Sequence, residues 1–147
     1  MTKEVLISIK GLQTSPQDET DTVEVISPGE YYYKNGKHYL MYDEFLEGQS
    51  EPTKTVIKLG NDFMEVTRKG PVAVHMMFER NKKNVTYYNT PVGSLLIGIE
   101  AQKMDFEEKE DRISAKVLYA LEMNYEHIGV CDIEVKVSPK GEKSFSL

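Results

Sequence analysis

Apolar and polar residues alternate with a period of two along most of this chain, and no long stretch shows the spacing of an amphipathic helix. The clearest run has every second residue apolar from Ile113 to Tyr125, and the alternation recurs from Cys131 to Val137. Since side chains of a strand point alternately to its two faces, each run predicts a half-buried β-strand. Together the runs predict about ten strands, near residues 5–10, 22–34, 38–45, 53–59, 63–68, 74–80, 85–89, 94–106, 113–125 and 131–137.

Turn signals separate these segments. Asn35-Gly36 predicts a two-residue hairpin, because a type I′ turn needs a positive φ at both central residues. Pro28-Gly29 interrupts the second segment and predicts a bend or a bulge. The acidic stretch 107–111 is expected to be a solvated turn between the eighth and ninth strands.

The short connections determine the predicted fold class. Nearly all of them are shorter than the dozen or so residues that a parallel crossover needs. We therefore predict an all-β fold, an antiparallel up-and-down meander of about ten strands that closes into a barrel and so removes its exposed edges. A sandwich of two sheets is the alternative that the strand spacing leaves open.

Composition and charge narrow the function classes. The 147 residues predict one domain, residues 1–147. With a net charge of −6 and no basic stripe, the chain is a poor partner for nucleic acid or an anionic membrane, and we expect neither. The apolar run 95–99 has the length of a strand, not of a membrane-spanning helix. Residues 1–5 lack signal-peptide character and Cys131 is the one cysteine, so we expect a cytoplasmic protein without internal disulfides.

Several segments resemble a known family: Tyr31–Glu44 with its Asn35-Gly36 turn, Thr53–Lys58, Arg68–Val72 and, most distinctively, Thr90–Gly93. From about Glu4 to Val137, the chain resembles the YwiB-like family of small bacterial proteins, a domain of unknown function placed among the calycin-like (lipocalin-like) β-barrels. It departs from the family at Asp111-Arg112, where relatives commonly have Gly-Arg. The resemblance implies a single calycin-like β-barrel and a bacterial source. It implies no catalytic or binding residues, because the family has no established activity.

No residue pattern identifies catalysis, a metal or a cofactor. His38, His75 and His127 lack the close spacing of metal ligands, so a zinc site would need all three to converge from distant strands. The ordinary interpretation is that they are solvated or singly hydrogen-bonded. Cys131 shares a face with apolar residues and is followed by Asp132, whose charge has the wrong sign to activate a thiol. The chain has no glycine-rich phosphate loop and no G-x-S-x-G motif.

Two arginines are candidate ligand-binding residues. Arg68 continues the alternation of Met64 and Val66, and Arg80 continues that of Met76 and Phe78. Either would end an inward-facing row near a barrel mouth, where a guanidinium can hold a ligand carboxylate. The hydroxyls of Tyr39 and Tyr88 would lie nearby if their strands turn the same face inward. The alternative is an arginine that reaches water or pairs with a structural carboxylate.

These observations leave competing functions. The first is a barrel that binds a small apolar or amphipathic ligand in its lumen, since tyrosine and methionine suit such a pocket but also fill ordinary cores. The second is a structural or interaction module with a filled barrel that acts through its outer surface, with a homodimer as one form. An enzyme is a third class, which no constellation of residues supports. A continuous lumen on the order of several hundred Å³ would separate the first from the second.

Overall fold

The computed structural model describes residues 3–11, 24–45, 50–71 and 73–140. The described residues form ten β-strands: β1 (Glu4–Lys10), β2 (Glu24–Lys34), β3 (Lys37–Glu44), β4 (Thr53–Leu59), β5 (Phe63–Lys69), β6 (Val74–Glu79), β7 (Lys83–Thr90), β8 (Gly93–Lys109), β9 (Arg112–Met123) and β10 (Glu126–Pro139). Among these residues no helix has the length and apolar character needed to cross a bilayer. Positions 22 and 23 of the second predicted strand, and position 72 of the segment that carries the family resemblance, lie outside the described residues.

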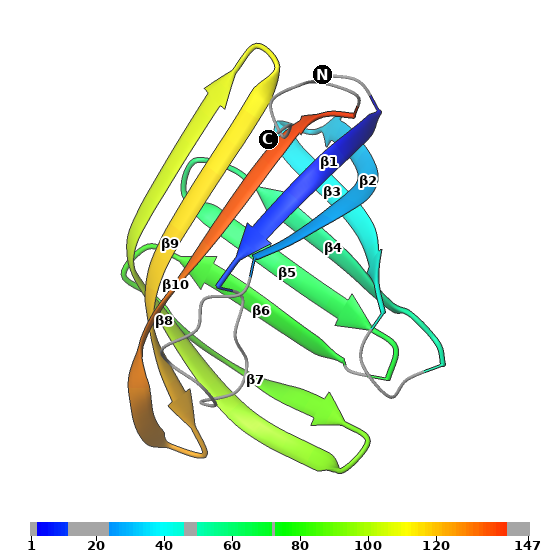
Figure 1. Ribbon diagram of the computed structural model, residues 1–147. Helices are drawn as coiled ribbons and strands as arrows, with labels where there is room; N and C mark the ends of the chain where they lie inside the picture. Colours follow the sequence, from blue (N-terminus) through cyan, green and yellow to red (C-terminus); the bar gives the residue numbers. More distant parts are fainter. Residues whose placement is uncertain (1–2, 12–23, 46–49, 72, 141–147) are drawn as a thin grey trace.

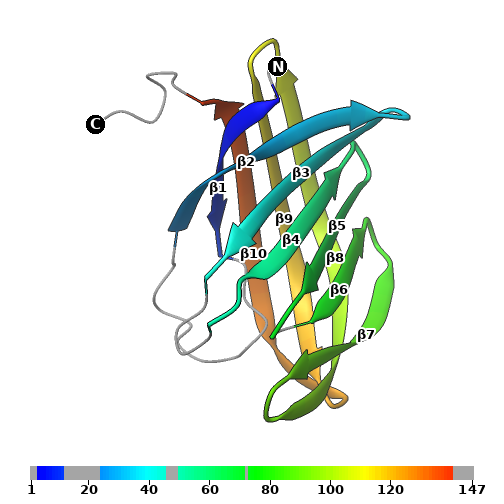
Figure 2. The same ribbon diagram turned by 90° about the vertical axis from the view of Figure 1, so that its right-hand side faces the viewer.

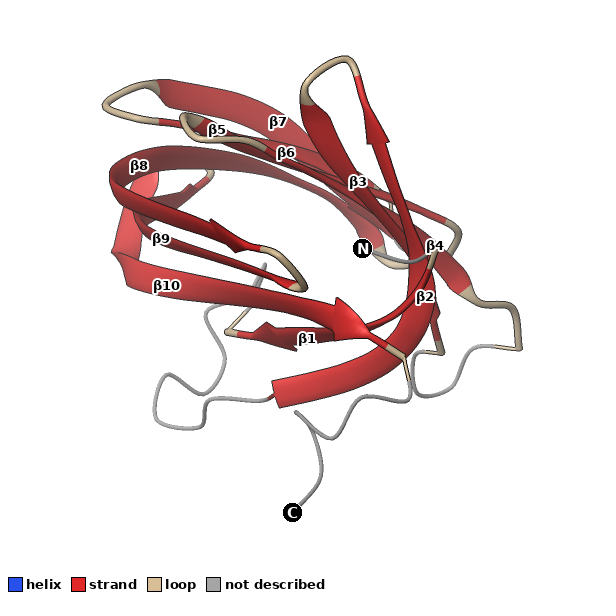
Figure 3. Ribbon diagram, turned by 90° about the horizontal axis from the view of Figure 1, so that it is seen from above, coloured by secondary structure: helices blue, strands red, loops and turns tan. Residues whose placement is uncertain are grey.

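The strands form one antiparallel sheet in the order β6-β5-β4-β3-β2-β1-β10-β9-β8-β7. Each neighbouring pair is consecutive in the chain except β1 and β10, which bring the two ends of the meander together. The sheet curls until β6 approaches β7, so the structure is a nearly closed barrel (Figures 1 and 3). The predicted all-β antiparallel meander is therefore confirmed.

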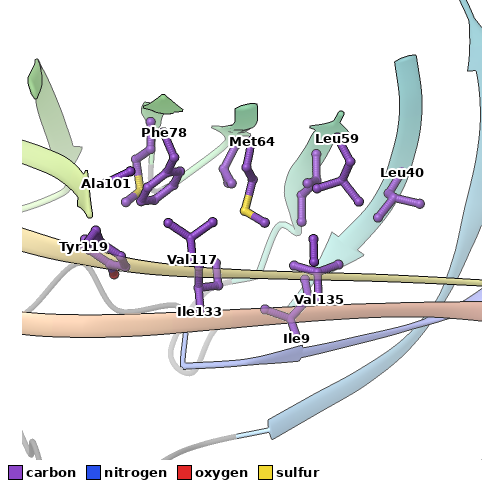
Figure 4. Close-up of a cluster of buried hydrophobic side chains, with 14 of the residues drawn as sticks. Ile9, Leu40, Leu59, Met64, Phe78, Ala101, Val117, Tyr119, Ile133 and Val135 are labelled. Atoms are coloured by element: carbon purple, nitrogen blue, oxygen red, sulfur yellow. The ribbon is translucent and has the colours of Figure 1, made fainter. Parts of the chain in front are cut away.

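Apolar rows from both sides of the barrel meet in one core. In Figure 4, Leu40, Met64 and Phe78 point across the interior toward Tyr119 and other side chains of the opposite strands. The rings of Phe78 and Tyr119 meet edge to face with centroids 4.9 Å apart. The predicted rows of β9 and β10 face inward together: Ile113, Ala115, Val117, Tyr119, Leu121, Met123, Ile133, Val135 and Val137 are all buried.

Side chains fill this interior. A continuous lumen would leave the inner faces of the strands accessible to water. Instead, β1, β3, β4, β5, β6, β8 and β9 each contribute large side chains with less than 2 % of their surface exposed. Leu40, Ile57, Phe78 and Tyr119 have none exposed at all. The inner wall of the described strands is therefore packed against itself, as in barrels whose core is solid.

The turns are largely as predicted, with two corrections. Asn35 and Gly36 have φ values of 54° and 76°, which confirms the predicted hairpin. Tyr125, expected on the inward row of β9, is 83 % exposed. It forms a second tight turn with Asn124, both residues having positive φ, and this turn ends the alternation at Met123. The acidic stretch 107–111 is mostly strand, because β8 continues to Lys109.

Pro28-Gly29 does not interrupt β2. The strand runs through both residues without a register shift, but it changes partner: residues 24–30 pair with β1 and residues 30–34 pair with β3. The predicted bend is the curve by which β2 leaves the side of β3 and continues beside β1 (Figure 3).

Candidate functional site

Arg68 faces inward at the end of β5, where it forms an ion pair with Glu44. Its Nη2 lies 3.2 Å from both Glu44 carboxylate oxygens. The hydroxyl of Thr55 donates to Glu44 Oε1 at 2.7 Å. Arg68 and Glu44 expose 12 % and 15 % of their side chains. The guanidinium thus has a carboxylate partner within the chain.

Tyr42 belongs to the same polar cluster. It is buried beside Thr55 and Glu44 on the inward face of β3. Burial raises the pKa of its hydroxyl well above the ordinary value, and the negative charge of Glu44 raises it further. The cluster therefore keeps Tyr42 protonated at neutral and moderately alkaline pH.

Arg80 follows β6 and closes the barrel seam. Its Nη2 donates to the backbone carbonyl of Met104 at 2.9 Å, and the amide of Asn81 donates to the carbonyl of Ala101 at 2.9 Å. These acceptors flank a register shift between Ala101 and Lys103 in β8. The pairing of β7 with β8 ends at Lys83 and Glu100, so the end of β6 meets β8 just beyond the part that β7 covers.

The two candidate tyrosines lie elsewhere. Tyr39 is on the outer face of β3, between the buried His38 and Leu40, with the Lys58 ammonium 5.3 Å from its ring centroid. Tyr88 is partly buried and packs against the core from β7. Arg68 and Arg80 lie at opposite ends of the β5–β6 hairpin. The four candidate residues therefore lie in four different places and do not gather in one site.

His38 is buried and has one side-chain hydrogen bond, which agrees with the prediction of a singly hydrogen-bonded histidine, and it has one acidic neighbour. Nδ1 lies 2.7 Å from the Tyr31 hydroxyl, and Nε2 lies 3.3 Å from Glu108 Oε1. The rings of Tyr33 and Phe106 enclose the imidazole at 4.8 Å and 5.6 Å. Burial raises the pKa of Tyr31, and Glu108 and Tyr33 add to that rise.

The other histidines form no metal site with His38. His75 pairs with Glu65 at 2.5 Å on the outer face. His127 is exposed at the start of β10. Within the described ranges, no three His, Cys, Asp or Glu side chains gather as metal ligands would.

A groove of about 860 Å³ lies on the outer face of the barrel, between β2 and β5. We call it the β2–β5 groove; it is lined by Ser27–Glu30, Met41–Asp43, Phe45, Lys54–Val56, Lys58, Thr67 and Lys69. Strand register places Met41, Val56 and Thr67 side by side across its floor. The next row is Asp43, Lys54 and Lys69.

The sequence analysis did not predict this groove, because the residues that line it come together only through the register in which β3, β4 and β5 pair. Lys54 and Lys69 are far apart in the chain and become opposite neighbours only when β4 pairs with β5. One local signal was present, since Pro28 lies in a segment that otherwise reads as a strand and a proline is tolerated there only beside an unpaired edge.

Comparisons with known proteins place the chain in a family. A family model described as a domain of unknown function, DUF1934, matches residues 7–135. The chain belongs to this family. It is 28% identical over 96 residues to "Uncharacterized beta-barrel protein YwiB" of Bacillus subtilis (strain 168). That alignment covers 64% of this chain and 66% of the relative, slightly under two thirds of the relative's length.

A solved structure supports the fold. The crystal structure of the ywiB protein from Bacillus subtilis matches with a TM-score of 0.77, over 93% of this chain and 92% of that chain. At 18% sequence identity this similarity establishes the shared β-barrel architecture. Together the comparisons support a β-barrel fold and membership of a family whose function is unknown.

Proposed function

We propose that this protein is an interaction module, a filled β-barrel that acts through its outer surface. The observation that carries the proposal is the packed interior. Large side chains from seven strands have less than 2 % of their surface exposed, while the β2–β5 groove opens on the outside. A second copy of the chain is one partner that this proposal admits.

The rival function, a small apolar or amphipathic ligand held in the lumen, would need this packing to open. Arg68 would also have to exchange Glu44 for a ligand carboxylate, and Arg80 would have to release the backbone of β8. Removing one partner of a buried charged hydrogen bond costs about 1.5–3 kcal/mol. Either arginine could therefore bind a ligand only if the protein lost stability at the bond that the arginine now makes.

Titration with a fluorescent fatty acid tests the proposal. We expect no saturable binding inside the barrel, and native mass spectrometry of gently purified protein should show no small bound mass. Arg68→Met and Arg80→Met keep much of the apolar stem and remove the charge. Saturable binding that either variant weakens more than about threefold, or 0.6 kcal/mol, would favour the lumen and overturn the interaction module.

A further inference from the structure

The hydrogen-bond ladder between β2 and β3 stops at Glu30 and Met41, although both strands continue. The amide of Tyr31 donates to the carbonyl of Lys3 at 2.7 Å, so its backbone groups point toward β1. Because these directions alternate along an antiparallel strand, the backbone of Pro28 points toward β3. Proline has no N–H to donate, which explains why the ladder ends there.

Beyond that point both strands present backbone groups that pair with no other described residue. On β2 they are the carbonyl of Pro28 and the N–H and carbonyl of Ile26, and on β3 they are those of Asp43. The described residues supply no partner for these groups. Ile26 is 50 % exposed. A free strand edge of this kind is where an extended peptide can add by main-chain hydrogen bonds.

Beside this edge lies an apolar floor. Met41 is 40 % exposed, and Val56 and Thr67 continue its row over β4 and β5. Phe45 stands at the margin of the groove with 76 % of its surface exposed. Alternate side chains of an added strand could therefore rest on apolar surface.

The charges in the groove indicate which strand would fit. Lys54 and Lys69 are directly opposite each other, and like charges in that position repel. Within the described chain neither has an ion pair, whereas Lys58 in the same groove pairs with Glu65 at 3.7 Å. Asp43 is directly opposite Lys54 in the same row, but no ion pair joins these two described residues. A carboxylate placed between the two ammonium groups would relieve their repulsion.

We propose that the β2–β5 groove binds an extended polypeptide segment of a partner protein, which adds to the free edge of β2 and places one Asp or Glu side chain between Lys54 and Lys69. This inference rests on the proposed function, because it names the partner of the outer surface. The main-chain bonds would supply affinity, and the floor and the lysine pair would supply selectivity.

Selection from a library of random twelve-residue peptides, displayed on phage and applied to the full chain, tests the inference. We expect the selected peptides to alternate apolar residues with one carboxylate. Lys54→Gln combined with Lys69→Gln should weaken them at least tenfold, and so should changing the peptide's Asp or Glu to its amide. Lys103→Gln with Lys116→Gln, both exposed on β8 and β9, is the matched control and should change affinity less than twofold.

Hydrogen exchange locates the peptide. Binding should slow exchange of the Ile26 amide. Two results would overturn the peptide site in the β2–β5 groove while leaving the interaction module intact. One is a selected peptide that leaves the Ile26 amide unprotected, and the other is equal affinity for the Lys54→Gln, Lys69→Gln variant and for the control variant. Lysine-dependent binding of decanoate without any peptide binding would show a small amphipathic ligand instead and overturn the peptide proposal. Fatty-acid binding in the barrel interior would separately overturn the proposed function.

Discussion

At the residue scale, Gly29 shows how closely two strands approach where their ladder ends. A Cβ on this residue would lie 2.5 Å from Ile7 Cδ1 and 2.6 Å from the carbonyl oxygen of Met41. The carbonyl belongs to the backbone and cannot rotate away. Glycine is therefore required here by close approach, not by an unusual φ.

We expect Gly29→Ala to lower the free energy of unfolding by about 1–3 kcal/mol, the usual range for overpacking. Urea denaturation followed by circular dichroism measures it. Gly129→Ala is the control, because a Cβ there meets nothing within 4 Å. Equal effects of the two substitutions would show that the close approach at Gly29 does not set the cost.

The core gives a second prediction at this scale. Leu121 has no exposed surface, and Leu118 on the outer face of the same strand is 37 % exposed. Leu121→Ala should cost about 2–5 kcal/mol through lost burial and a residual cavity. Leu118→Ala should cost clearly less in the same urea titration. A loss below about 0.5 kcal/mol for Leu121→Ala would be incompatible with a packed interior.

Tyr42 makes stability depend on alkaline pH. Its folded pKa lies above the ordinary tyrosine value of 10.0 because of burial and Glu44. Below pH 10 both folded and unfolded chains keep this proton, so its contribution is constant. Above pH 10 the unfolded chain loses the proton first, and stability falls by up to about 1.4 kcal/mol per pH unit.

Unfolding free energies measured from pH 9 to 11 check this prediction. We expect wild type to lose stability above pH 10 and Tyr42→Phe to lose less over the same interval. Tyr31, whose pKa is also raised, leaves a residual slope in both proteins. Parallel curves would show that Tyr42 is not coupled to folding.

At the scale of elements, the seam between β6 and β7 is held by a few specific bonds. Ala73 and Asn89 exchange two backbone hydrogen bonds of 2.9 Å and 2.8 Å. At the other end Arg80 and Asn81 bind the bulged part of β8, and the side-chain amide of Asn84 donates to the carbonyl of Met77 at 2.8 Å. Side chains and a bulge replace a continuous ladder here, so this is where the barrel should open most easily.

Arg80→Met should loosen the seam. We expect faster hydrogen exchange at the Asn81 amide and a stability loss of about 1.5–3 kcal/mol, since the change removes a charged hydrogen bond to Met104. Arg112→Met, at the exposed start of β9, is the control. An unchanged exchange rate of the Asn81 amide would show that the other contacts of the seam, not Arg80, hold the barrel closed.

At the scale of the whole molecule, the strands cross in two layers that face each other through one core (Figures 2 and 4). The first and last strands, β1 and β10, pair with each other, so the two edges of the sheet are β6 and β7. The barrel therefore closes between two strands from the middle of the chain. This arrangement buries most inward positions, and beyond Pro28 it leaves an edge of β2 to which no described strand is paired. The outer groove is thus a consequence of how the barrel closes.

The amino-acid sequence by itself determined the strands, most turns and the inward faces. Alternation and local turn chemistry are short-range properties, which is why Asn35-Gly36 and the row from Ile113 to Met123 were predictable. Local reasoning failed at Tyr125, because a hydrophobic residue in a turn looks like one more alternating position.

Only the tertiary structure decided which strands meet at the seam, whether the interior is open, and where a site lies. The sequence left open whether Arg68 and Arg80 bind a ligand or a group of the chain itself, because their partners, Glu44 and the Met104 carbonyl, are 24 residues away in sequence. Lys54 and Lys69 became neighbours only through strand register. Contacts between distant residues depend on register, twist and closure, and these follow from the packing of the whole chain rather than from any one segment.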